Sequence, residues 1–348
     1  MAFLRNLLHQ VEYGARGNTV ATLDSASQTR YICSHRFTHL HTCTMKPIRI
    51  GTRGSELALA QANQVGEVIA RAPAGRPVEI VPIRTRGDRI AGPLQAVGGK
   101  GLFTAELEAA LREGTLDLAV HSAKDLPAEM ADDLVIAAVL PRADVRDALV
   151  SRAGALEELP AGARVGTSSL RRSALLRAFR LDVKITHLRG NVDTRIQRVL
   201  GERADFDATI LAMAGLIRGG WLEKLGANVH PLSADLFVPA AGQGTLVLQT
   251  RAADAELIAA LRTVNHDETL QALHAERGIL RRLNASCHGC LAVYVFPAAV
   301  GWRARAMVAR PDGSDMLRVE SHSTSAHKAA EALTETLLAS GAKERLGT

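Results

Sequence analysis

The stretch IRIGTRGSELALAQANQVGEVIAR (48–71) sets the architecture of this chain, because its plan returns as RVGTSSLRRSALLRAF (164–179). Each copy begins as a short strand with apolar residues in alternation and is expected to turn at Gly-Thr. A serine then stands where a helix should begin, and apolar residues follow at helical spacing. The chain therefore repeats one strand–turn–helix unit.

Two further pairs of segments continue this repeat. VEIVPIRTRGD (78–88) is similar to VKITHLRGNVD (183–193), since each is a β-rich run that ends near an Arg-Gly turn. The helix, turn and strand indicated by residues 103–127 return in residues 194–216. Alternating strands and helices indicate largely parallel sheets that helices cover on both faces. In such sheets ligands bind beyond the carboxyl ends of the strands.

The 348 residues exceed the usual size of one domain. FVPAAGQGTLVLQTR (237–251) returns to a β-rich pattern after the second half and is expected to cross back to the first. From about residue 264, a long helix, a turn with CHGC, a hairpin with Pro-Asp-Gly and a final helix indicate a small α+β unit. The predicted fold class is α/β, with two doubly wound domains plus a small α+β C-terminal domain. The expected boundaries are 46–141 with 239–263, then 142–238, then 264–348.

Residues 1–45 are expected to form an N-terminal extension that is disordered or not native. The first 44 contain four Arg, two acidic residues and many Ser and Thr, which resembles an organelle transit peptide. Alternatively, Met45 stands directly before KPIRIGTRGS, so the residues before it could be upstream sequence read from a start chosen too early. Upstream sequence would leave a cytoplasmic protein, whereas a transit peptide would direct it to an organelle.

Composition argues against two classes of partner. The net charge of +6 includes a surplus of two positive charges in the first 44 residues, so the rest is too weakly basic to coat nucleic acid. No uninterrupted apolar run of about eighteen residues is present, so no segment is expected to span a membrane.

Two of the four cysteines, Cys287 and Cys290, lie in LNASCHGCLA (283–292), and the other two lie in the first 45 residues. A disulfide framework is not expected from so few thiols. No second CxxC or HxxxH is present to complete a closed zinc site, and we expect no metal. The pair could be a redox pair, half a metal site, or one working thiol beside a bystander.

Basic residues fall at predicted strand ends and helix starts in corresponding places of both halves. They are Arg53, Lys124, Arg171, Arg172, Arg189, Arg195 and Arg218. Ser55, Ser168 and Ser169 add hydroxyl groups near helix N-termini, where free backbone N–H groups favour anions. Neither half carries GxxxxGK[ST] or GxGxxG after its first strand, which disfavours a phosphate. Several carboxylates on one ligand fit better, because Arg binds carboxylates in bidentate fashion. For each Arg alone, a solvated surface charge is the competing interpretation.

HSAKDLP (121–127) follows the predicted buried strand LDLAV. Asp125 should be ionised among so many cations. It either holds a developing cation and moves protons, or caps the following turn. The preceding AGPLQAVGGKG (91–101) is rich in glycine and has no counterpart in the second half. It is either a mobile lid or an ordinary surface connection.

These motifs, in order, identify a resemblance to a known family. GTRGS, TRGD, VGGKGLF, HSAKDLP, VGTSSLRR, LRGNVDTR, PAAGQG and NHDET–AER, from about Ile48 to the C-terminus, resemble the porphobilinogen deaminase (hydroxymethylbilane synthase) family. The resemblance implies three domains, the first two built like periplasmic binding proteins. It implies a transferase of tetrapyrrole and haem biosynthesis that joins four porphobilinogen molecules head to tail, releases ammonia and frees linear hydroxymethylbilane. It also implies a dipyrromethane cofactor, one per chain, held by a thioether.

The resemblance assigns roles to individual residues. Asp125 would be the catalytic carboxylate and Cys287 the covalent cofactor anchor. Cys290 stands where the family usually has proline, and Ala285 and Ser286 replace two glycines. The cofactor would also be held by Ser122, Lys124, Ser168, Arg171, Arg172, Arg189 and Gln243. The substrate would be held by Arg53, Ser55, Arg195 and Arg218, and the lid bordered by Asp88, Lys100 and Phe103.

The family also implies a monomer whose partner is the small-molecule substrate, with no nucleic acid and no membrane. Growth of the product inside one protein predicts hinges near Pro141–Arg146 and Phe237–Ala240. Two alternatives stay open on the residues alone: a non-catalytic anion-binding protein of the periplasmic type, and a CxxC redox or metal module.

Overall fold

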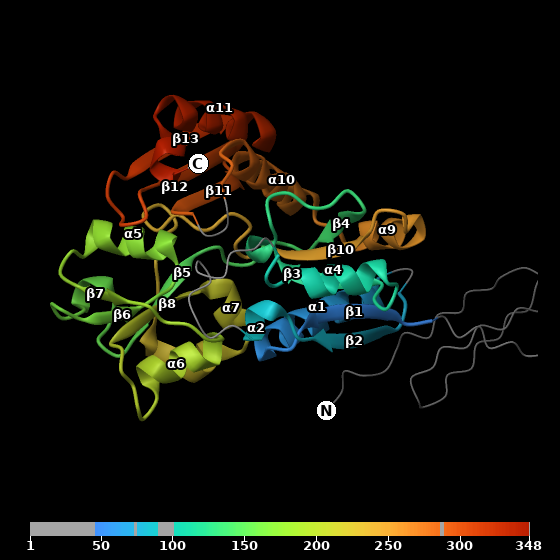
Figure 1. Cartoon of the computed structure of the whole chain (residues 1–348), viewed down its shortest axis with the longest axis horizontal. Helices are drawn as coiled ribbons and strands as arrows, with labels where there is room; N and C mark the ends of the chain where they lie inside the picture. Colours follow the sequence, from blue (N-terminus) through green and yellow to red (C-terminus); the bar gives the residue numbers. More distant parts are fainter. Residues whose placement is uncertain (1–45, 73–74, 90–100, 286–288, 348) are drawn as a thin grey trace, which may run out of the picture. The chain divides into compact units, whose positions relative to one another are not determined.

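The computed structural model describes residues 46–72, 75–89, 101–285 and 289–347 (Figure 1). The chain divides into two units, Met1–Lys46 and Pro47–Thr348. The second unit contains three β-sheets.

The first sheet has the strand order β2-β1-β3-β10-β4. β1 is parallel to β2 and β3, whereas β10 is antiparallel to β3 and β4. The strands are β1 (Ile48–Arg53), β2 (Val78–Ile83), β3 (Leu118–Ser122), β4 (Leu134–Val139) and β10 (Leu246–Arg251).

The second sheet has the equivalent order β7-β6-β8-β5-β9, with β5 as its antiparallel strand. The strands are β5 (Asp147–Ser151), β6 (Arg164–Gly166), β7 (Lys184–Thr186), β8 (Ala208–Ala212) and β9 (Val229–Pro231). The antiparallel strand of the first sheet, β10, follows the second repeat (residues 164–216) in sequence. The antiparallel strand of the second sheet, β5, precedes that repeat. The predicted return of residues 237–251 to the first half is confirmed, but both sheets are mixed, because the chain crosses between them twice.

Helices accompany both sheets. With the first sheet lie α1 (Glu56–Arg71), α2 (Arg86–Arg89), α4 (Ala105–Arg112), α9 (Ala255–Leu261), η1 (Ala123–Asp125) and η4 (Arg262–Val264). With the second lie α5 (Leu170–Phe179), α6 (Val192–Leu200), α7 (Met213–Arg218), α8 (Trp221–Leu225), η2 (Leu156–Glu158) and η3 (Gly226–Asn228). The predicted helix starts are confirmed at Ser55 and Ser169, whose hydroxyl oxygens accept from the N–H groups of Ala58 and Arg172.

One predicted turn is wrong. β1 continues through Gly51 to Arg53 instead of turning at Gly-Thr. A Cβ on Gly51 would lie 2.1 Å from Leu116 Cδ1, and one on Gly166 would lie 2.5 Å from Leu188 Cδ2. The repeated glycine is therefore a site of close packing against the strand.

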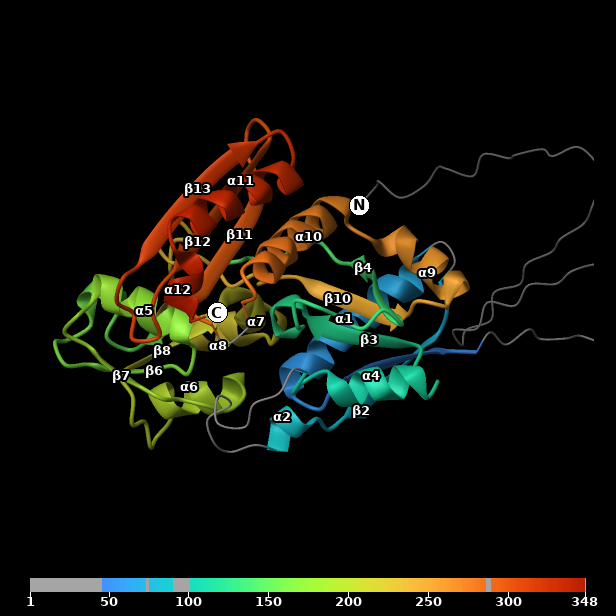
Figure 2. The same ribbon diagram turned by 45° about the horizontal axis from the view of Figure 1, so that its top comes forward.

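The third sheet is antiparallel, with the order β11-β12-β13. Its elements are α10 (Asp267–Arg282), β11 (Leu291–Pro297), β12 (Trp302–Val308), β13 (Leu317–Ser323), α11 (Ala326–Ala339) and α12 (Ala342–Leu346). α10 packs on α11 and β11 and also reaches β4 of the first sheet (Figure 2). This agrees with the predicted α+β unit, while the residue boundaries of the three domains stay a prediction.

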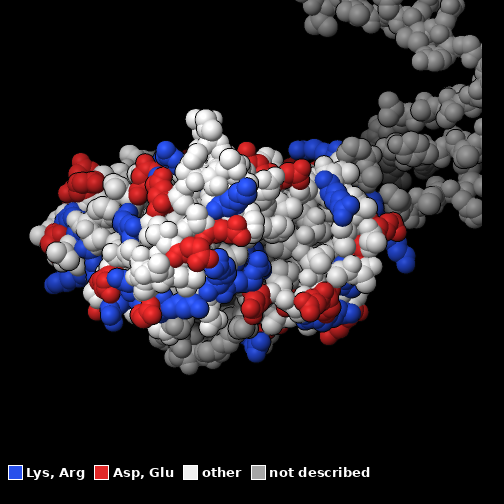
Figure 3. Space-filling view, turned by 90° about the horizontal axis from the view of Figure 1, so that it is seen from above, with Lys and Arg blue, Asp and Glu red and all other residues white. Residues whose placement is uncertain are grey.

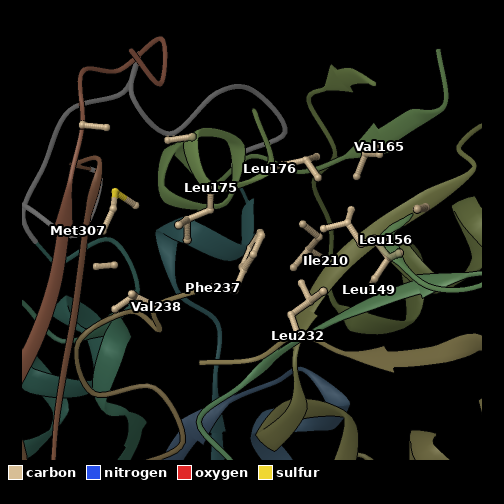
Figure 4. Close-up of a cluster of buried hydrophobic side chains, with 14 of the residues drawn as sticks. Leu149, Leu156, Val165, Leu175, Leu176, Ile210, Leu232, Phe237, Val238 and Met307 are labelled. Atoms are coloured by element: carbon tan, nitrogen blue, oxygen red, sulfur yellow. The ribbon is translucent and has the colours of Figure 1, made fainter. Parts of the chain in front are cut away.

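The largest apolar cluster joins the second and third sheets. Leu149 of β5 and Ile210 of β8 pack with Leu175 of α5, and the cluster continues through Phe237 to Met307 of β12 (Figure 4). Because all five side chains are at most 1% exposed, one continuous core holds both sheets against α5. Among the described residues, no helix is both long and apolar enough to cross a membrane.

Candidate active site

Arg53, at the end of β1, brings together three of the predicted site residues. Its guanidinium lies 4.2 Å from the centre of the Phe103 ring, and its Nε donates to Asp88 Oδ1 at 3.1 Å. Thr85 donates to the other Asp88 oxygen from its hydroxyl, at 2.8 Å, and from its backbone N–H, at 3.2 Å. Burial acts to raise the pKa of Asp88, but the hydrogen bonds from Arg53 and Thr85 hold it below its usual value. Lys100 lies outside the described residues.

β3 leads directly into η1, which carries Lys124 and Asp125. Asp125 is partly buried, and no hydrogen bond or ion pair from the described part of the chain reaches its carboxylate. Its negative charge nevertheless acts on Lys124 and on Arg195 of α6. Burial, and then the charge of Arg172, lower the pKa of Lys124 to about 8. The end of β3 thus holds a carboxylate that has no hydrogen-bond or ion-pair partner among the described residues and lies near several cations.

Arg171, Arg172 and Gln243 converge on a buried carboxylate, Asp147, and we call these four residues the Asp147 cluster. Arg171 Nη2 and Arg172 Nη2 each donate to one Asp147 oxygen at 2.8 Å, and Gln243 Nε2 donates at 3.0 Å. The other Nη atoms of the two arginines donate to the carbonyl oxygens of Val238 and Ile210, both at 2.7 Å. The sequence placed these arginines directly on a ligand, whereas the structure buries most of their donors in the protein.

The Asp147 cluster is nearly inaccessible to solvent. Asp147 and Gln243 are 0% exposed, and Arg171 and Arg172 are 4% and 6% exposed. Burial alone would raise the pKa of Asp147, yet the two guanidinium groups hold it well below its usual range. The carboxylate therefore stays ionised and fixes both arginines in place.

Two more of the predicted arginines, Arg195 and Arg218, belong to the second half of the chain, and Arg189 acts on the first of them through its charge. Arg195 donates from Nε to Gly190 O at 2.9 Å, and Arg218 donates from Nη2 to Gly244 O at 2.8 Å. Burial lowers the pKa of each to about 10, and for Arg195 the charges of Arg172 and Arg189 add to this effect. Arg218 is the last residue of α7, so it lies neither at the end of a strand nor at the start of a helix, the two kinds of place predicted for these basic residues.

The predicted serines make hydrogen bonds to other groups of the protein. Ser55 caps α1, Ser168 Oγ donates to Leu188 O at 2.7 Å, and Ser122 Oγ donates to Gln61 Oε1 at 3.3 Å. On the face drawn in Figure 3, basic and acidic side chains are interspersed.

Comparison with known proteins places the chain. The sequence model of "Porphobilinogen deaminase, dipyromethane cofactor binding domain" matches residues 48–259. The chain belongs to the porphobilinogen deaminase family. The porphobilinogen deaminase of Nitrobacter winogradskyi is 45% identical over 271 residues, which cover 76% of this chain and 84% of that relative.

Two other relatives cover more of their own length. The porphobilinogen deaminase of Streptococcus sanguinis is 40% identical over 77% of this chain and 88% of the relative. That of an Exiguobacterium species is 39% identical over 87% and 99%. Apo YehZ from Escherichia coli, a solved structure, covers 68% of this chain and 92% of its own at 11% identity and a TM-score of 0.38, too low to argue from.

The buried polar groups of the chain fit the cofactor in the family's description. Arg172 Nε, Arg218 Nε and Gln243 Oε1 are buried with no hydrogen-bond partner among the residues that the structure describes. The first two can donate to carboxylates, and the third can accept from a pyrrole N–H. A dipyrromethane carries both kinds of group, so these residues match its chemistry.

Of the two cysteines in the CHGC segment, only Cys290 belongs to the residues that the structure describes. Cys287 lies outside the described residues. Cys290 is 2% exposed, its Sγ lies 3.6 Å from Leu170 O, and burial raises its pKa to about 11. A thiol protonated over the neutral range is a poor nucleophile, so Cys290 suits packing better than covalent chemistry.

Sequence reasoning missed Asp147 and the hydrogen-bonded pair His121 and Gln249. Asp147 carried a weak signal, because it is the only charge in the otherwise apolar strand DALVS. His121 stands in the recognised HSAKDLP motif, but nothing in the sequence indicates that its ring meets Gln249, 128 positions away.

Proposed function

We propose that this protein joins four porphobilinogen molecules head to tail into hydroxymethylbilane, with Asp125 as the catalytic carboxylate. The observation that carries the proposal is the placement of Asp125: its carboxylate has no hydrogen-bond or ion-pair partner among the described residues, while its charge acts on Lys124 and Arg195. A ligand with cationic character and attached carboxylates matches this arrangement.

The proposed reaction requires a negative charge beside the pyrrole ring that loses ammonia. When the aminomethyl nitrogen of porphobilinogen leaves as ammonia, the pyrrole becomes an electron-poor azafulvenium. The Asp125 carboxylate accepts from the pyrrole N–H and stabilises the positive charge as it develops. The α-carbon of the neighbouring pyrrole then forms the new bond and loses its proton. Repetition of this step at one site adds four rings, and water then breaks the bond that holds them and leaves its hydroxyl group on the released linear product.

The cations serve the carboxylates of the pyrroles. Each porphobilinogen carries an acetate and a propionate, so several rings bring many negative charges. We assign Lys124, Ser122, Ser168, Arg171, Arg172, Arg189 and Gln243 to the cofactor, and Arg53, Ser55, Arg195 and Arg218 to the substrate. Because both Nη atoms of Arg171 donate to protein groups, Asp147 and Val238 O, we assign it mainly to holding Arg172 and the local charge in place.

The cofactor supplies, when bound, the first pyrrole to which substrate units are added. We assign Cys287 as its anchor on the sequence motif. We propose that three residues border the lid predicted at residues 91–101: Asp88 and Phe103, which lie with Arg53, and Lys100. Residues 91–100 of that segment lie outside the described residues. We further propose a cytoplasmic monomer that binds neither nucleic acid nor membranes.

Replacement of Asp125 tests the proposed mechanism. Asp125→Asn removes the negative charge at nearly constant shape, so we expect ammonia release from porphobilinogen to fall about a hundredfold or more. Asp132→Asn, an exposed residue in the same segment, is the matched control and keeps normal turnover. Near-normal turnover in Asp125→Asn, with an unchanged melting temperature, would refute the catalytic assignment.

Intact-protein mass tests the cofactor and the anchor. We expect a mass increment of one dipyrromethane in the wild-type chain, retained by Cys290→Ser and lost in Cys287→Ser. A wild-type chain that binds porphobilinogen without any covalent increment would instead support the alternative of a non-catalytic anion-binding protein.

A further inference from the structure

A chain of hydrogen bonds links Glu108 of α4 through Gln249 of β10 to His121 of β3, the strand that leads into η1 and Asp125. In the sheet, His121 pairs with Val247 and Ala119 pairs with Gln249, so the side chains of His121 and Gln249 share one face. His121 Nε2 lies 2.9 Å from Gln249 Oε1, and Gln249 Nε2 donates to Glu108 Oε1 at 3.3 Å. His121 is 6% exposed and Gln249 0%.

Glu108 sets the direction of this chain. Carboxylate oxygens accept hydrogen bonds, and the other oxygen of Glu108, Oε2, lies 4.0 Å from Nη1 of Arg112. Gln249 must therefore turn its NH₂ group towards Glu108 and its oxygen towards His121. The proton between His121 and Gln249 then resides on His121 Nε2.

The charge state of His121 follows from its surroundings. Gln249 offers it a neutral oxygen instead of a carboxylate, and burial lowers its pKa to about 4. The charged groups that act on the ring are Asp125 on η1 and Arg53 on β1, which have opposite effects. His121 is therefore a neutral imidazole with hydrogen on Nε2, in electrostatic reach of two proposed site residues.

We propose that the Glu108–Gln249–His121 chain makes His121 a positioning residue, by keeping an uncharged imidazole within electrostatic reach of Asp125. This inference goes beyond the proposed function and rests on it, because it concerns the electrostatics of the Asp125 carboxylate. An imidazolium at this position would compete with the developing pyrrole cation for the same negative charge. An amide between Glu108 and His121 prevents this, because it passes on a hydrogen bond without placing an anion against the ring.

The test exchanges the two acceptors. In the double variant Glu108→Gln/Gln249→Glu, the same two functional groups are present and the net charge is unchanged, but the carboxylate now touches His121 Nε2. The imidazole is expected to hold a second proton at neutral pH. We expect kcat for ammonia release to fall about tenfold with little change in KM, and to recover as pH rises through the new histidine ionisation.

A third substitution separates the effect of a charged histidine from the other effects of exchanging Glu108 and Gln249. Adding His121→Gln to the double variant keeps a donor near the carboxylate but removes the ionisable ring, and it should restore most of the kcat and abolish the new pH dependence. A double variant with wild-type kcat and pH profile would overturn the proposal, as would failure of His121→Gln to rescue a variant whose melting temperature is normal.

Nuclear magnetic resonance of the wild-type protein with ¹⁵N-labelled histidine provides a readout that does not depend on turnover. His121 should show a protonated Nε2 and an unprotonated Nδ1 from about pH 6 to 8. A doubly protonated ring or the opposite tautomer would overturn the proposal. The Asp125→Asn variant tests the proposed function separately. If that variant kept near-normal turnover, the proposed function would be refuted, and the tautomer of His121 in the wild-type protein would still be measured independently.

Discussion

Asp147 shows at the scale of single residues how buried charge is held in this protein. It binds two arginines that also donate to backbone carbonyls, and it receives a further hydrogen bond from Gln243. A buried carboxylate of this kind is costly to remove, because the opposite charges that it leaves are out of reach of water.

We therefore expect Asp147→Ala to lower the free energy of unfolding by about 3–5 kcal/mol. Denaturant unfolding measures the change. Asp182→Ala, which removes the exposed partner of Arg180, is the matched control and should unfold like wild type, because surface ion pairs contribute little. Equal effects of the two substitutions would contradict the structural role of Asp147.

Lys124 gives the molecule a pH-dependent stability. Its pKa is about 8 in the folded protein, against 10.5 for an ordinary lysine side chain, so between these values the unfolded chain binds a proton that the folded chain does not. Stability should rise with pH across this window, and the full cost of burying the ammonium is present below a pH of about 8.

Lys124→Met should therefore raise the unfolding midpoint at neutral pH and flatten its rise between about pH 8 and 10. Denaturant titrations at several pH values measure both effects. Lys328→Met, on the exposed surface of α11, provides the control and should preserve the wild-type profile. A Lys124→Met profile parallel to wild type would show that Lys124 does not titrate in this range.

At the scale of elements, the position of η1 depends on the loop before β10. Gly242 has a φ of +74°, and a Cβ there would lie 2.8 Å from Ala123 Cβ and 3.0 Å from the Ala123 carbonyl carbon. Because Ala123 begins η1, the missing side chain lets this loop lie against the segment that carries Lys124 and Asp125.

Gly242→Ala should thus displace η1 and reduce turnover by more than its effect on stability. The backbone strain alone is about 1–3 kcal/mol. Gly220→Ala is a close control, because Gly220 has a φ of +66° but a Cβ added there would meet no atom within 4 Å. Similar turnover in the two variants would mean that contact with Ala123 does not position η1.

At the scale of the whole molecule, one buried ion pair ties the third sheet to the connections between the first two. Glu276 of α10 is 0% exposed and accepts from Arg142 Nη1 at 2.7 Å, from Gly242 N at 2.6 Å and from Val295 N at 2.8 Å. Arg142 lies in the predicted hinge Pro141–Arg146, and its Nε donates to Gln243 O at 2.9 Å. The hinge motion itself stays a prediction.

Glu276→Ala should lower the free energy of unfolding by about 3–5 kcal/mol, because it leaves Arg142 and two backbone N–H groups without their acceptor. Glu335→Ala breaks the exposed pair between Glu335 of α11 and Arg282 of α10, and should change stability little. Calorimetry measures both. If Glu276→Ala melts like Glu335→Ala, the pair does not join the sheets.

The local units of this fold could be predicted from the sequence because their signals are local. Gly51 and Gly166 mark the repeat, Ser55 and Ser169 mark helix starts, and Asp125 follows a short apolar strand. The sequence could not show that Arg171 and Arg172 face Asp147, because a predicted helix start gives the position of a residue and not the partner that its side chain meets. The same holds for Glu276, whose three partners come from distant segments.

The two repeated halves, the small C-terminal unit, the family and the chemistry of the proposed site all follow from the amino-acid sequence, since periodicity, spacing and ordered motifs are properties of neighbouring residues. The folded chain was needed to learn which strands exchange between the sheets, which arginines bind Asp147 inside the protein, and that no partner from the described residues reaches the Asp125 carboxylate. The energy of a buried charge depends on the groups that surround it in space, and folding gathers those groups from positions far apart in the chain.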